Sequence, residues 1–291
     1  MQGLRYMAVS LALGFIATWA SENLFWIVPP DGTSVPDWLM TWVAYSIAAA
    51  CALSMVLWTG AGGWAAAFLG GAVLGYLLEG IVVGTIYDAF PFQLVWTPVA
   101  WHALITGGLI LGGGLAPLSL RRRMLLWLAA GGLFTVWSLF WPLERPVLPG
   151  PDGLLVYLAL PGLGVVVALW LVGRLGRPAP RRWVLWVAPT MALAVGVIQA
   201  VTFPTPLRAV LPVLLLALWG LMRRAGPGQW AVRQPLWRHL PVLIVPVMVA
   251  FGAPSLWAIL GAVDVSLPFA VAAGVAGLGL MAQIALRGLR R

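Results

Sequence analysis

The chain has 291 residues, of which 62% are hydrophobic and 9% are charged, and its formal net charge is +9. A soluble domain carries roughly 25% charged residues, so a chain this poor in charge cannot cover a water-facing surface and is not a soluble globular protein. The basic residues lie in short gaps between apolar runs, whereas nucleic-acid binding needs them on a solvated face. We therefore expect one integral-membrane domain, residues 1–291, that contacts the lipid bilayer and no nucleic acid.

The rare residue types limit the chemistry further. All 17 basic residues are arginine, so the chain has no lysine for a Schiff base or a phosphate-binding loop. One cysteine, Cys51, allows no internal disulfide and no cysteine-based metal site. There are two histidines and no nucleotide-binding motif. The sequence therefore indicates no metal, and the cofactor is unknown.

Ten apolar runs follow one another along the chain, each about 20 residues long, which is the length of a helix that crosses a bilayer. The pattern predicts an all-α polytopic bundle of about ten transmembrane spans. Only Pro204 and Thr205 separate the seventh run from the eighth, so these two runs could form a tight hairpin or a re-entrant pair. A cleavable leader ending at Thr18-Trp19-Ala20 is the competing interpretation of the first run. The predicted spans are 5–28, 38–58, 63–86, 94–116, 124–142, 153–173, 183–203, 206–222, 240–260 and 267–286.

The charged residues orient these spans. With ten spans, fifteen of the 17 arginines lie on one face, and only Arg145 and Arg208 lie on the other. Because loops rich in arginine stay in the cytoplasm, we predict cytoplasmic N- and C-termini in a bacterial inner membrane. Every acidic residue outside the spans falls in a loop of the opposite, outer face; these residues are Asp31, Asp37, Asp88, Glu144, Asp152 and Asp264.

Strongly polar side chains gather in the first four spans, which divides the chain into a polar four-helix part, 1–117, and a largely apolar six-helix part, 118–291. At 1.5 Å per residue, Glu22 lies roughly 9 Å, Glu79 about 10 Å and His102 about 12 Å inside the outer ends of their spans. Three helices thus carry ionisable groups at one depth. Such groups are costly in lipid and usually mark a site or a pathway, so we expect these three residues to be catalytic. A buried network that only fixes helix register is the structural alternative, and one metal ion bound by the trio is allowed by ligand type.

The neighbouring residues predict how this site is built. The small faces formed by Gly71 and Gly75 would let the third and fourth spans approach closely. Tyr76 lies one turn from Glu79 on the same helix face and could donate a hydrogen bond to it. The loop 87–93 would cover the cluster from outside. We expect the following residues to bind substrate: Asn23, Tyr76, Tyr87, Asp88 and Trp101.

An intramembrane enzyme is the first functional hypothesis. Glu79 and His102 would form an acid–base pair that acts on an apolar or lipid-like substrate, such as an isoprenoid. The order Glu79, Val83-Gly84, Tyr87 and Pro98-Val-Ala-Trp101 resembles the integral-membrane carotenoid hydratases over about 25 residues, and no residue role is carried over from this likeness.

A proton-coupled transporter of an apolar or amphiphilic small molecule is the second hypothesis. Ten spans in 291 residues, with both ends inside, resemble the size and topology of the drug/metabolite transporter superfamily. Prolines in the later spans, among them Pro161, Pro189 and Pro254, could interrupt helices as in transporters. The third hypothesis is a non-catalytic subunit of a larger membrane assembly, because helix faces rich in small residues also suit docking.

Overall fold

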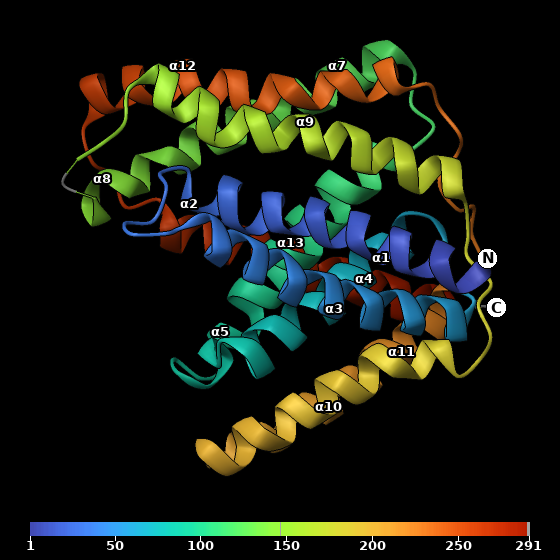
Figure 1. The fold of residues 1–291 in the computed structure, drawn as a ribbon. Helices are drawn as coiled ribbons and strands as arrows, with labels where there is room; N and C mark the ends of the chain where they lie inside the picture. The colour runs from blue at the N-terminus through green and yellow to red at the C-terminus, as the bar shows by residue number, and fades with distance from the viewer. Residues whose placement is uncertain (146, 290–291) are drawn as a thin grey trace.

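The computed structural model describes residues 1–145 and 147–289, and in these two ranges the fold is entirely helical. Ten helices are long and apolar enough to cross a membrane, which confirms the multi-pass bundle and its contact with lipid. The side of the membrane on which the termini lie stays a prediction. Figure 1 shows the start of the first helix and the last helix ending on the same side of the molecule.

The ten spans contain the following segments, some of them composite. The first span consists of α1 (Gln2–Thr18), η1 (Trp19–Asn23) and α2 (Leu24–Trp26), and the second is α3 (Val35–Thr59). The third consists of α4 (Gly63–Leu77) and η2 (Leu78–Val82), and the fourth of α5 (Gln93–Val95), η4 (Trp96–Gly112) and α6 (Gly113–Leu115). The fifth consists of α7 (Leu120–Trp137), η5 (Ser138–Phe140) and α8 (Trp141–Glu144). The later spans are α9 (Pro151–Leu175), α10 (Val184–Thr202), η6 (Pro206–Ala209) with α11 (Val210–Ala225), η7 (Leu236–Leu243) with α12 (Ile244–Leu260), and α13 (Ser266–Leu289).

One boundary differs from the prediction for a reason that the backbone shows. The third span ends at Val82 instead of residue 86, because Gly84 adopts a left-handed backbone with a φ of 89° that a helix cannot continue through. A short 3₁₀ turn, η3 (Thr85–Tyr87), follows it. The seventh and eighth spans are 19 and 20 residues long, so each is long enough to cross the bilayer.

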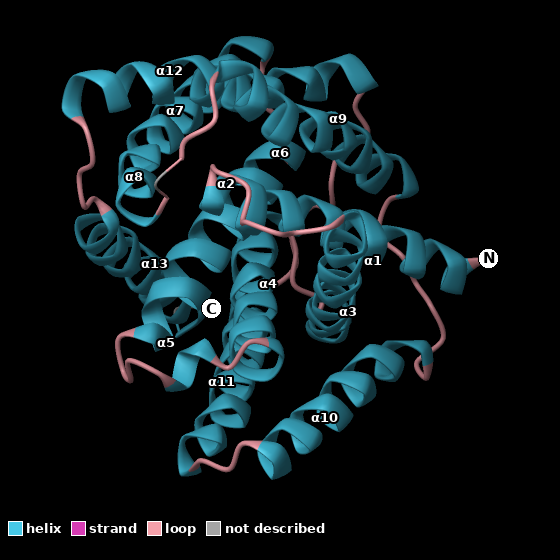
Figure 2. Cartoon of the chain, turned by 60° about the vertical axis from the view of Figure 1, so that its left-hand side comes forward, coloured by secondary structure: helices cyan, strands magenta, loops and turns pink. Residues whose placement is uncertain are grey.

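The helices form three groups that Figures 1 and 2 show from two directions. Helices α7, α9 and α12 pack together at the top, and α10 and α11 lie at the bottom edge. The first and fourth spans lie between them: α1 packs on both α3 and α9, and η4 packs on α4 and α13. The first and fourth spans therefore contribute to both hydrophobic cores of the molecule.

The helical geometry differs between the two parts of the chain. Segments η1, η2 and η4 have wide π-type turns, and all three belong to the first four spans. By contrast, Pro161, Pro189 and Pro254 lie inside helices that continue through them, so the expectation that prolines interrupt the later spans is wrong. Wide turns of this kind often occur at functional sites.

Candidate functional site

A buried acid–base pair joins the third and fourth spans. Nε2 of His102 lies 3.1 Å from Oε1 of Glu79, and the His102 and Glu79 side chains are 3% and 14% exposed. The second carboxylate oxygen of Glu79 accepts a hydrogen bond from the Thr85 hydroxyl. The predicted contact between Glu79 and His102 is confirmed. The pair is neutral overall whether the proton sits on the carboxyl or on the imidazole, which avoids the cost of a lone charge away from water.

The other ring nitrogen of His102 connects to the first span. Nδ1 lies 3.0 Å from Oγ of Ser21, and that oxygen lies 2.8 Å from Oγ1 of Thr106. All three of these residues are buried. Ser21 and Thr106 are absent from the sequence prediction because single hydroxyl residues in an apolar run carry no pattern. Ser21 directly precedes Glu22, and Thr106 follows His102 by one turn, which is the only signal that could have pointed to them.

Glu22 belongs to a second, adjoining network. Its carboxylate accepts hydrogen bonds from the Tyr45 hydroxyl at 2.7 Å and from the Trp26 indole nitrogen at 3.0 Å. The ring of Tyr45 lies beside the ring of His102, with centroids 6.2 Å apart. Glu22 is thus brought to the depth of the acid–base pair without a hydrogen bond to it. In the described residues no three His, Cys, Asp or Glu side chains gather as metal ligands.

The local backbone explains how these side chains meet. Glu22, Glu79 and His102 lie in η1, η2 and η4, the three segments with wide turns. Helices α4 and η4 approach closely at Gly75, where an added Cβ would lie 2.6 Å from Cβ of His102. The same holds at Gly71, where it would lie 2.9 Å from Cα of Gly107. The predicted small-residue contact between the third and fourth spans is therefore present. It allows His102 to pack closely against the helix that carries Glu79.

The two tyrosines named from the sequence bind backbone carbonyls. The expected hydrogen bond from Tyr76 to Glu79 is wrong, because the Tyr76 hydroxyl donates to the Leu94 carbonyl at 2.9 Å. The Tyr87 hydroxyl donates to the Gly80 carbonyl at 3.0 Å. Burial raises the pKa of the Tyr87 phenol above its usual value, although the nearby Arg208 opposes this. Tyr76 therefore ties the third span to the fourth, and Tyr87 ties the turn η3 back to the third span.

The remaining predicted binding residues lie apart from the pair. Asp88 is exposed in the loop 87–93. The amide of Asn23 donates to the Tyr157 carbonyl at 3.3 Å, on the α9 side of the first span. Trp101 is buried, donates to the Ala20 carbonyl at 3.1 Å and packs against Phe25. Their roles in substrate binding stay predictions, and the structure gives Asn23 and Trp101 hydrogen bonds to backbone carbonyls.

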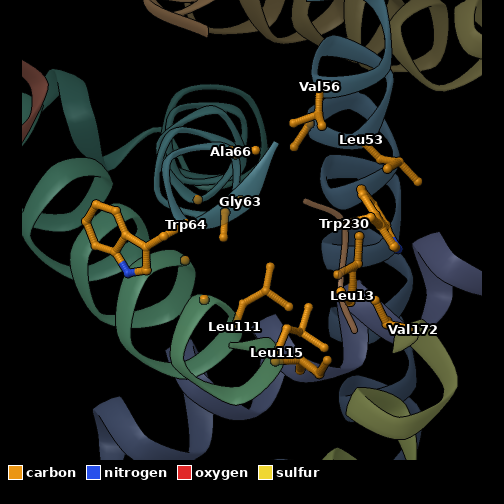
Figure 3. A pocket seen from close by; sticks show the side chains of 18 of the residues that line it. Leu13, Leu53, Val56, Gly63, Trp64, Ala66, Leu111, Leu115, Val172 and Trp230 are labelled. Carbon is orange, nitrogen blue, oxygen red and sulfur yellow. The ribbon is translucent and has the colours of Figure 1, made fainter. Parts of the chain in front are cut away.

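Thr106 also lines an apolar cavity of about 290 Å³, which Figure 3 shows from close by. Its walls come from α1, α3, α4, η4 and α9, and the segment 229–232 also contributes to them. Thr106 and Gln229 are its only lining residues with a hydroxyl or amide side chain. Trp230 lines it as well, and its indole nitrogen is buried without a partner in the described chain. The loop between α11 and η7 therefore places one tryptophan at the cavity wall.

A second buried polar cluster lies at the other end of the fourth span. Arg123 is 1% exposed and donates to the carbonyls of Gly114 and Ala116 at 2.9 and 2.8 Å. It also donates to the side-chain oxygen of Gln234 at 2.8 Å. His239 is 1% exposed, because η7 packs against α9 and α7.

Comparison with known proteins finds no match for this chain among family models, curated proteins or solved structures. The function is therefore inferred from the geometry of the site.

Proposed function

We propose that this chain is an intramembrane enzyme of the bacterial cytoplasmic membrane that transfers a proton to or from an apolar or amphiphilic substrate. The observation that supports this proposal most strongly is the unbroken series of hydrogen bonds from Glu79 through His102 and Ser21 to Thr106 at the cavity wall. The Arg-rich face lies in the cytoplasm under this proposal, following the charge distribution of the loops.

The donors and acceptors along this series have a definite order. A neutral imidazole has one N–H and one bare nitrogen. In the basic form of the pair, Glu79 is a carboxylate and His102 is neutral, so Nε2 of His102 must donate to Glu79 and Nδ1 accepts from the Ser21 hydroxyl. This form carries one negative charge, and the proton that it takes up makes the pair neutral. The Thr106 hydroxyl then donates to Ser21. A proton taken from a carbon beside Thr106 passes along the hydroxyls to His102, where Glu79 stabilises the imidazolium that forms. The electron pair left on the substrate shifts its double bond, and the relay returns the proton at another carbon, so the net reaction is an isomerisation.

The surroundings favour this chemistry. Few waters compete for these groups because His102, Ser21 and Thr106 are buried, Glu79 is only 14% exposed, and the adjoining cavity is apolar. Electrostatic interactions are stronger in such a site than in water. A positioned acid–base group contributes roughly 10²- to 10⁴-fold to rate.

A solvent-isotope experiment tests the proposal. Purified protein is returned to vesicles made from the total lipid extract of its source cells, transferred to D₂O and followed by mass spectrometry after back-exchange of O–D groups. We expect a lipid-soluble product with carbon-bound deuterium from the wild type. Glu79→Gln should lower its formation by roughly 10²-fold or more, because the amide cannot stabilise the imidazolium. Glu144→Gln, which removes an exposed carboxylate at the end of α8, is the matched control; wild-type labelling by Glu79→Gln would contradict the proposal.

Acyl transfer is a second candidate, favoured by one observation. Ser21, His102 and Glu79 follow the order of a serine–histidine–carboxylate triad. Against it, Thr106 and not Ser21 lines the cavity, whereas a nucleophile must reach the reacting atom. Covalent labelling of Ser21 by a fluorophosphonate probe would favour acyl transfer, and a lack of labelling would favour proton transfer.

A proton-coupled transporter and a subunit of a membrane assembly remain the alternatives. A transport path needs polar walls, and the cavity offers almost only apolar side chains. Pro161, Pro189 and Pro254 lie in continuous helices, unlike the broken helices of many transporters. A docking role alone does not explain why the buried pair extends through two hydroxyls to a cavity.

A further inference from the structure

The cavity adjoins a hollow at the Arg-rich face. Pro117 and Val232 line both of them, so the two share a wall at the end of the fourth span. The cavity side of this wall is apolar, and the hollow side carries basic and amide side chains. The other residues around the hollow are Arg233, Gln234, Pro235, Trp237 and Arg238.

The positive charge at this hollow has no carboxylate partner. All eight acidic residues of the chain lie in the predicted outer loops or at Glu22 and Glu79. Ion pairs in the described ranges involve only Glu79 and Asp31 as acids. Arg233 and Arg238 therefore face the hollow as uncompensated cations, and an anionic ligand would meet no repulsion there.

The walls of the hollow are held in place from inside the bundle. Gln234 accepts from the buried Arg123 and donates to the Ala116 carbonyl at 3.2 Å. The guanidinium of Arg238 lies over the ring of Trp237, 5.4 Å from its centroid. A fixed guanidinium beside an amide and an indole suits a phosphate at headgroup depth, because arginine donates to phosphate in a fork geometry.

We propose, resting on the function proposed above, that the substrate is an amphiphile with a phosphate headgroup bound by Arg233 and Arg238 and a hydrocarbon tail in the cavity. Thr106 precedes Pro117 by eleven residues along the fourth span, so the hydroxyl lies roughly 16 Å from the hollow at about 1.5 Å per residue. The relay therefore meets the tail and not the headgroup. The substrate class is a phosphorylated lipid whose tail accepts or releases a proton at a carbon, as an unsaturated chain does.

Ligand-dependent thermal unfolding of the purified full chain, read by tryptophan fluorescence, tests this site. The probes are farnesyl phosphate, farnesol, inorganic phosphate and dioleoyl phosphatidylglycerol. We expect farnesyl phosphate to raise the midpoint temperature at the lowest concentration. The double variant Arg233→Gln/Arg238→Gln should bind it at least about tenfold more weakly, since charge-assisted hydrogen bonds are lost. Arg121→Gln/Arg122→Gln, which removes two exposed charges from the same face, should bind as the wild type does.

The remaining outcomes would overturn either this inference or the proposed function, and they distinguish the two. Equal responses to inorganic phosphate and farnesyl phosphate would show an anion site without a tail site and overturn the inference. A stronger response to phosphatidylglycerol would identify a structural lipid and overturn it as well. Glu79→Gln should bind farnesyl phosphate normally, so intact binding without deuterium transfer would remove the proposed function alone. Deuterium transfer without binding of farnesyl phosphate would remove this inference alone.

Discussion

Replacing His102 with alanine is expected to lower both activity and stability, and this is the largest effect that the site predicts. The imidazole is the only partner that the structure gives Oε1 of Glu79, and it lies 3.1 Å away. Breaking a buried pair by removing one member costs about 3–5 kcal/mol, because the other group stays buried without compensation. Deuterium transfer should fall by at least roughly 10²-fold, since the acid–base group itself is gone.

A double-mutant cycle separates the two effects. Glu79→Ala/His102→Ala removes both members, so it should be more stable than His102→Ala alone in chemical or thermal unfolding. Its activity should remain as low as that of either single variant. If the double variant were less stable by the sum of both single losses, the two side chains would not act as a pair. If His102→Ala retained full deuterium transfer, the relay would be wrong.

The second large effect is expected at the two hydroxyls between His102 and the cavity. Ser21→Ala interrupts the series at its middle, and Thr106→Val interrupts it at the cavity wall without a large change in volume. Each should lower deuterium transfer by about 10²-fold or more, while the free energy of unfolding changes by only about 1–2 kcal/mol.

A double variant tests whether the two hydroxyls act as one unit. Groups that act as one unit lose most of their effect with the first substitution. The double variant Ser21→Ala/Thr106→Val should therefore transfer deuterium at nearly the rate of the slower single variant. Ser10→Ala is the matched control, because its buried hydroxyl bonds only the Tyr6 carbonyl of its own helix. Multiplying losses in the double variant, or wild-type rates in either single variant, would contradict the relay.

The sequence predicts the bundle well because lipid imposes a simple rule on it. Ten apolar runs become ten helices, and even the two runs separated by Pro204 and Thr205 form separate helices of spanning length. The prediction from the sequence fails where the backbone geometry changes. The third span ends early, at Val82, because Gly84 has a positive φ. A hydropathy pattern also cannot show that α10 lies at the edge, with only Leu185 and Ala188 buried.

The candidate site is predictable in its charged members and not in its neutral ones. Glu79 and His102 are conspicuous because ionisable groups in apolar runs are costly. Ser21 and Thr106 are hidden because hydroxyl side chains often bond their own helix, as Ser10 does. The wide turns that bring His102 to both Glu79 and Ser21 shift the helical register, so a regular spacing of 3.6 residues does not place these side chains correctly.

The identity and fate of the molecule held by the inactive protein test the central claim most directly. Glu79→Gln is purified under mild conditions, its bound lipid is extracted and identified by mass spectrometry, and the same lipid is then given to the wild type in D₂O. The account predicts a phosphorylated amphiphile that the wild type converts to a product with carbon-bound deuterium in its tail, and that Glu79→Gln leaves unchanged. Recovery of only bulk phospholipid, unchanged by the wild type, would contradict it.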